Sequence, residues 1–93
     1  MENLDAAELN IRRWCTDYLA ETLKLPPSRI DPQTKFARFG MESAMSVFFL
    51  VALEDWLGVE LGSDVVFDHP TIAELAHHVA GRFPQAAVSA AGK

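Results

Sequence analysis

The chain has 93 residues, of which 49% are hydrophobic and 23% charged, and its formal net charge is −5 at pH 7. This length predicts one domain, and the composition is that of a globular protein rather than of a disordered chain. The acidic net charge argues against nucleic-acid binding, which needs a basic face. The longest apolar run, residues 47–53, is far too short to span a bilayer.

The first element is a helix predicted over residues 6–23. Asp5 and Glu8 have the spacing of a capping box, and Pro26 bars a longer helix because proline lacks the amide that the next turn needs. Side chains of one face recur at helical spacing: Ile11, Trp14, Cys15, Tyr18, Leu19 and Thr22. Cys15 is the only cysteine, which excludes an internal disulfide and a multi-cysteine metal site. We expect it to be a small buried hydrophobe.

A long connection, residues 24–42, separates this helix from a second helix predicted over residues 43–57. Connections of this length are uncommon in compact domains and usually carry function or anchor residues. We expect three apolar side chains to hold it against the core: Ile30, Phe36 and Phe39. Gly58 occupies the position just past the end of the second helix, where glycine is favoured.

The last third of the chain predicts two further helices. Residues 63–66 are expected to form a short one, and Thr71 and Glu74 form a capping box for another that reaches about Arg82. Its buried face is expected to hold Ile72, Leu75, Ala76 and Val79. Pro84 bars its continuation, so residues 86–93 are predicted to be a flexible, frayed tail behind a domain of residues 1–85. The predicted fold is all-α, a small bundle of three main helices and one short helix.

Two segments decide the functional interpretation. Residues 39–43, Phe-Gly-Met-Glu-Ser, open the second helix. Residues 53–61, Leu-Glu-Asp-Trp-Leu-Gly-Val-Glu-Leu, are followed by residues 66–71, Val-Phe-Asp-His-Pro-Thr, and by a Leu-Ala pair at 75–76. In this order and spacing, over about residues 6–82, the sequence resembles acyl carrier proteins, particularly those of polyketide synthases. There a Gly-x-Asp-Ser-Leu element opens the second helix and a Phe-Asp-x-Pro-Thr element precedes the last one.

The resemblance implies a non-catalytic carrier in which Ser43 takes the place of the family's modified serine. A phosphopantetheinyl transferase joins 4′-phosphopantetheine from coenzyme A to that hydroxyl, and the terminal thiol of the arm carries acyl groups as thioesters. The implied partners are ketosynthase, acyltransferase or tailoring enzymes of a polyketide pathway. The N-terminus lacks the basic region and apolar run of a signal peptide, so we expect a cytoplasmic protein, and we expect a monomer.

The residues around Ser43 suit a point of attachment. A helix N-terminus favours an added phosphate by about 0.3–1 kcal/mol, and Glu42 would help to keep that phosphate in solvent. Ser43 is a poor hydrolase nucleophile, because the Gly-x-Ser-x-Gly elbow and a preceding strand are missing and the histidines lie far along the sequence. Without the second motif, Ser43 would be interpreted as a helix cap worth about 1 kcal/mol.

Three residues depart from the family pattern: Glu42 replaces an aspartate, Ala44 a leucine, and Phe48 an acidic residue. The second helix has an apolar stripe expected to face the core, formed by Phe49, Leu50, Leu53, Trp56 and Leu57. A second apolar stripe, beside Ser43, is formed by Ala44, Val47, Phe48 and Val51. We expect this second stripe, with Glu42 and Glu54, to dock a partner enzyme; the alternative is that another helix covers Phe48.

Two other interpretations stay open at this point. A peptidyl carrier would usually have a Gly-Gly-His/Asn-Ser-Leu element here, and Met41 and Glu42 favour the acyl type instead. A helical interaction module could have kept the carrier fold without the modification. We expect no metal site, because His77 and His78 are adjacent on a helix and point about 100° apart.

Overall fold

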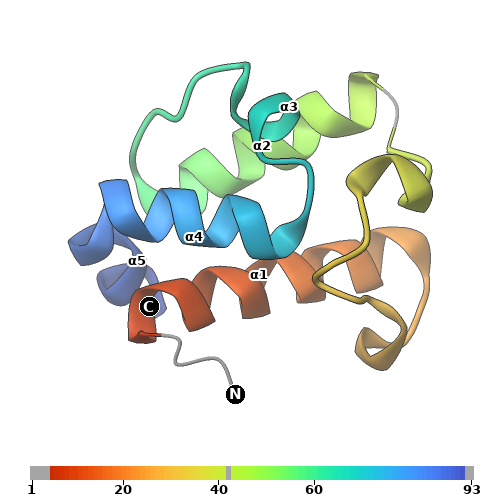
Figure 1. Ribbon diagram of the computed structural model, residues 1–93, viewed down its shortest axis with the longest axis horizontal. Helices are drawn as coiled ribbons and strands as arrows, with labels where there is room; N and C mark the ends of the chain where they lie inside the picture. Colours follow the sequence, from red (N-terminus) through yellow and green to blue (C-terminus); the bar gives the residue numbers. More distant parts are fainter. Residues whose placement is uncertain (1–4, 42, 92–93) are drawn as a thin grey trace.

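A computed structural model describes residues 5–41 and 43–91 of the chain (Figure 1). The described residues form helices, with two short 3₁₀ turns and a single isolated β-bridge. In chain order the elements are α1 (Ala6–Leu23), η1 (Pro27–Arg29), η2 (Phe36–Phe39), α2 (Ser43–Leu57), α3 (Val65–Asp68), α4 (Ile72–Arg82) and α5 (Pro84–Ala91). None of the helices in the described ranges is long and apolar enough to cross a membrane.

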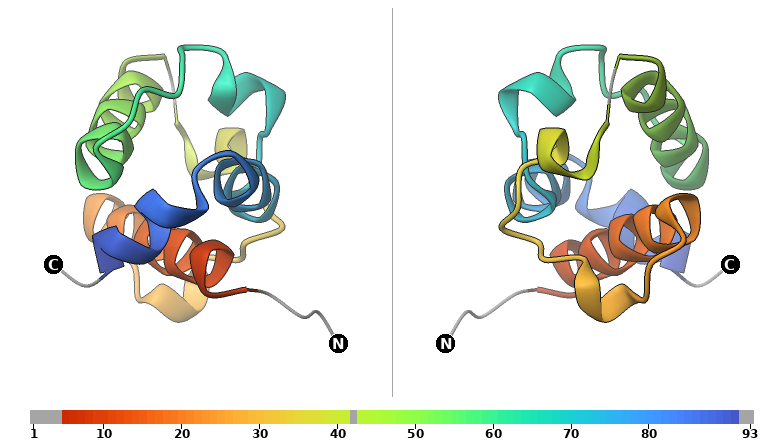
Figure 2. Two further views of the ribbon diagram at one scale, coloured as in Figure 1. Left: turned by 90° about the vertical axis from the view of Figure 1, so that its left-hand side faces the viewer. Right: turned by 90° about the vertical axis from the view of Figure 1, so that its right-hand side faces the viewer.

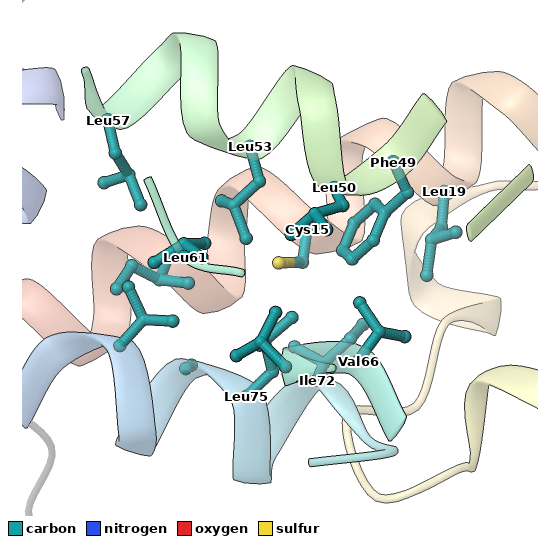
Figure 3. Close-up of a cluster of buried hydrophobic side chains, with 14 of the residues drawn as sticks. Cys15, Leu19, Phe49, Leu50, Leu53, Leu57, Leu61, Val66, Ile72 and Leu75 are labelled. Carbon is teal, nitrogen blue, oxygen red and sulfur yellow. The ribbon is translucent and has the colours of Figure 1, made fainter. Parts of the chain in front are cut away.

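The three longest helices enclose one core. Helix α4 packs along α1, α5 covers one end of α1, and α2 lies across the core from them (Figures 1 and 2). Figure 3 shows the side chains of α1, α2 and α4 meeting at the centre, where the Cys15 sulfur points inward. Cys15 is fully buried, as predicted, and burial raises the pKa of its thiol far above the ordinary value.

Helix α1 has the predicted bounds, and its two ends show why. Asp5 accepts a hydrogen bond from the Glu8 amide at 2.8 Å, and Lys24 ends the helix in the left-handed conformation, with φ of 61°. The Glu8 carboxylate reaches another helix, because its Oε1 lies 3.1 Å from Nδ1 of His77. This contact joins the start of α1 to α4.

The long connection is anchored as predicted. Ile30 and Phe36 are buried, and Phe39 packs half-buried against the core. Backbone hydrogen bonds tie the connection to the start of α4: the Phe36 amide donates to the Pro70 carbonyl at 2.8 Å, and the Ala73 amide to the Pro32 carbonyl at 3.0 Å. The segment before α2 is therefore held in place at both of these points.

Helix α3 forms two residues later than predicted, at Val65–Asp68 instead of residues 63–66. Gly62 adopts a φ of 90°, which places the chain in a turn, and Ser63 and Asp64 remain exposed outside the helix. The helix begins where Val65 and Val66 can both be buried. Helix α4 begins as predicted, with the Thr71 hydroxyl accepting from the Glu74 amide at 3.1 Å.

The expectation of a frayed tail from residue 86 is wrong for the residues described. Pro84 does end α4, but it also opens α5, because proline is well tolerated at the first position of a helix, where its missing amide has no partner to lose. Ala87 and Ala90 are buried, and Asn10 donates a hydrogen bond to the Ala87 carbonyl at 3.4 Å. Small side chains let α5 approach α1 closely. Residues 92 and 93 lie outside the described ranges.

Candidate functional site

Ser43 is the first residue of α2. The chain reaches it through Gly40, which has a φ of 75°, and through Met41, which is buried and holds the approach to the helix. Ala44, the next residue, is exposed, so α2 begins at the surface of the molecule. Glu42 and the side chain of Ser43 lie outside what the structure describes, and the roles expected of them stay predictions.

Helix α2 is apolar on two sides, and only one of them faces the core. Phe49, Leu50, Leu53 and Leu57 are buried as predicted, while Trp56 is half-buried. On the second stripe, Val47 is 57% exposed, Phe48 67% and Val51 48%. The alternative that another helix covers Phe48 is therefore wrong. We call the exposed residues Ala44, Val47, Phe48 and Val51 the apolar surface.

A hollow of about 320 Å³ lies between α2 and α3, beside the apolar surface. Its lining is shared by the two helices and a residue of the turn before α3: Ser46, Val47, Leu50, Ser63, Val66 and Phe67. Phe67 is 77% exposed and forms one rim of the hollow. The sequence analysis did not identify Phe67 as a surface residue. The predicted helix ended at residue 66 and left Phe67 outside it; in the structure the helix begins at Val65, and the burial of Val65 and Val66 leaves Phe67 exposed.

The acidic residues are at the far end of α2. Asp55 and Glu60 are exposed, and together with Glu54 they line a separate hollow of about 380 Å³. Oε2 of Glu54 accepts a hydrogen bond from the Leu61 amide at 2.7 Å. The carboxylate of Glu54 thus holds the loop that follows α2, a role that was not predicted. Its expected part in docking stays a prediction.

The three histidines make two separate contacts. His77 reaches Glu8 on α1, whereas the rings of His69 and His78 stack with their centroids 4.0 Å apart. The adjacent pair His77 and His78 therefore points to different partners. Within residues 5–41 and 43–91, no three His, Cys, Asp or Glu side chains converge in a way that could hold a metal ion.

Comparison with known proteins gives a consistent result. Residues 13–79 match the family model for the phosphopantetheine attachment site. The chain is 29% identical over 73 residues to the acyl carrier protein TtuC of Teredinibacter turnerae, a match that covers 78% of this chain and 84% of that protein. It is 39% identical over 67 residues to one component of the phenolphthiocerol/phthiocerol polyketide synthase of Mycobacterium tuberculosis, covering 71% of this chain but only 4% of that much longer protein.

Solved structures with the same fold include two carrier proteins. Asl1650, an acyl carrier protein from Anabaena sp. PCC 7120 with a variant phosphopantetheinylation-site sequence, superposes with a TM-score of 0.80 at 32% identity, over 89% of this chain and 96% of that one. A free-standing peptidyl carrier protein from Acinetobacter baumannii gives a TM-score of 0.76 at 26% identity, over 84% of this chain and 98% of that one.

Proposed function

Because this chain belongs to the phosphopantetheine attachment site family, we propose that Ser43 is the residue that carries its arm. The family and the helical fold make the chain a carrier with a covalent 4′-phosphopantetheine group. The observation that supports Ser43 is its place as the first residue of α2, next to the exposed Ala44 and two residues after Met41, which ends the anchored segment. The arm, when bound, supplies a terminal thiol that carries an acyl group as a thioester.

The start of α2 suits a phosphodiester. The first amides of a helix have no carbonyl partner within the helix, and they stabilise a nearby anion by about 0.3–1 kcal/mol. Residues 43–46 include no acidic residue to oppose it, while Glu42, immediately before them, would help to keep the phosphate in solvent. This contribution is small enough to orient a phosphate without immobilising the arm. Ser43 and these amides would hold the phosphate, and the rest of the arm would stay free to reach partner enzymes.

We propose that the chain delivers its cargo without catalysing a reaction, and that the apolar surface is where partner enzymes dock. The support is the exposure of Val47, Phe48 and Val51 next to the attachment residue. A phosphopantetheinyl transferase and the ketosynthase, acyltransferase or tailoring enzymes of a polyketide pathway are the proposed partners, since polyketide synthases are among the relatives. Glu54 and its acidic neighbours at the other end of α2 would speed the encounter with basic partners.

Coexpression with a broad-specificity phosphopantetheinyl transferase tests the attachment residue. Intact-protein mass should show one phosphopantetheinyl addition, which Ser43→Ala abolishes. Ser46→Ala, one turn further along the same helix, is the matched control and should still be loaded. If Ser43→Ala were loaded, or if the unaltered chain stayed bare with every competent transferase, the assignment of Ser43 would be wrong.

A peptidyl cargo is the second candidate, because a peptidyl carrier protein is among the structures with this fold. Met41 and Glu42 differ from the Gly-Gly-His/Asn element expected of that type and favour an acyl cargo. Mass spectrometry of the protein isolated from its native host distinguishes the two. An aminoacyl group on the arm would support the peptidyl type, and an acyl group without an α-amine the proposed one.

A further inference from the structure

Two histidines connect α3 to α4. His69 follows the last residue of α3, and its ring stacks on the ring of His78 in the middle of α4, with centroids 4.0 Å apart and planes inclined by 17°. Both side chains are half-buried. Each ring is neutral or charged according to pH, so the contact between the two helices depends on protonation.

Helix α3 lies in a short segment between two fixed points. On one side, the Leu61 amide is held by Glu54 at 2.7 Å, and on the other the Pro70 carbonyl is held by the Phe36 amide at 2.8 Å. Directly after the first of these points, Gly62 has the positive φ of a turn. Between them, residues 62–69 are held by the burial of Val65 and Val66 and by the histidine stack. The stack is therefore one of the contacts that position α3.

Charged side chains from both helices surround the stack. Asp64 and Asp68 from the α3 side and Arg82 from α4 line the same hollow of about 280 Å³ as the two rings. Burial lowers the pKa of His78, and His69 and Arg82 lower it further, while Asp68 acts in the opposite direction. His77, also on α4, points instead to Glu8 on α1.

We propose that the His69–His78 stack is a pH-sensitive clasp, which fixes α3 against α4 while at least one ring is neutral and releases it when both are protonated. Two positive charges about 4 Å apart repel strongly enough, even at the dielectric constant of water, to weaken the contact about fivefold. Since α3 forms one wall of the hollow beside the apolar surface, acid would change the shape of that surface. This inference does not depend on whether Ser43 is loaded.

The direction of the pH effect follows from the lowered pKa. A histidine whose pKa is lower in the folded protein binds fewer protons there than in the unfolded chain, so the folded form gains stability as pH rises. The contribution of the clasp is complete well above 6.5, the ordinary histidine value, and is lost as pH falls through 6.5 towards the pKa of the folded protein.

Hydrogen exchange of the unloaded protein tests the clasp. The amides of Phe67, Asp68 and His69 are bonded to the carbonyls of Asp64 and Val65, and their protection, corrected for the intrinsic rate, should fall about fivefold or more between about pH 7.5 and about pH 5. The Cys15 amide in α1 should keep its protection. Equal protection of the α3 amides at both pH values, or a parallel loss at Cys15, would overturn the proposal.

Matched variants of the two adjacent histidines assign the effect. His78→Gln keeps a planar polar group but cannot be charged, and it should remove the pH-dependent loss at α3, whereas His77→Gln should preserve it. A loss that persists in His78→Gln contradicts the clasp. NMR titration of the unaltered protein gives an independent measure: the pKa of His78 should lie below the ordinary histidine value of 6.5, and a midpoint at or above that value would overturn the proposal.

Discussion

Phe48 and Phe49 are neighbours on α2 with opposite environments, and this contrast yields a sharp prediction. Phe49 is fully buried, with its ring centroid 5.9 Å from that of Trp14, 5.5 Å from Tyr18 and 5.4 Å from Phe36. Phe49→Ala removes these contacts and leaves a cavity, so it should lower the free energy of unfolding by about 3–5 kcal/mol. Phe48 is 67% exposed, and Phe48→Glu should change that free energy by no more than about 0.5 kcal/mol.

Urea denaturation followed by far-UV circular dichroism measures both variants. A domain of this size has a total stability of about 5–15 kcal/mol and loses about 4–8 °C of melting temperature for each kcal/mol. In a thermal melt followed by the same signal, Phe49→Ala should therefore unfold tens of degrees below the unaltered protein, or it should fail to fold. If it fails to fold, Phe49→Leu provides a milder comparison. Phe48→Glu should keep the midpoint and slope of the unaltered protein while raising the KM of the transferase. A destabilisation by Phe48→Glu of more than about 2 kcal/mol would refute the exposed placement of the apolar surface.

Two further predictions concern the core and the C-terminal helix. Cys15 should resist iodoacetamide in the folded protein and react in urea, because burial raises the pKa of its thiol and excludes the reagent; alkylation without denaturant would contradict its position. Removing residues 84–93 should lower the free energy of unfolding by about 2 kcal/mol, since Ala87 and Ala90 then leave the core. Removing residues 92–93 alone is the control, and an unchanged midpoint in the longer truncation would show that α5 does not stabilise the bundle.

The two longest helices could be predicted to the residue because their ends depend on local chemistry. The cap at Asp5, the proline after α1 and Gly58 after α2 act within a few residues of the backbone groups that they satisfy or disrupt. The core stripe of α2 was also predictable, since helical periodicity alone places side chains on one face.

The remaining features depend on contacts between distant parts of the chain. Helix α5 is stabilised by its packing against α1, where Ala87 and Ala90 are buried. Because each alanine gains little free energy from burial, the composition of this segment alone predicted a frayed tail. The bond from the Leu61 amide to Glu54 requires a loop conformation that no local pattern specifies. Whether Phe48 is exposed depends on where α1 and α3 lie, and periodicity could identify the stripe without deciding what covers it. The stack of His69 on His78 likewise exists only once α3 is placed.

Helix α2 has an uncharged first part and an acidic end, and this difference suggests how a carrier could bind its partner enzymes. Its first eleven residues, 43–53, contain no charged side chain, while Glu54 and Asp55 follow on a helix about 22 Å long. Charges act over about 8–10 Å at moderate salt, and they mainly set the rate at which partners associate. Apolar groups act only in contact, and they mainly set the rate at which partners dissociate. If the arm is attached at Ser43 as proposed, the short-range contacts of the apolar surface would be made beside it. A partner would then be steered by the acidic end of α2 and held at the end where its active site receives the cargo.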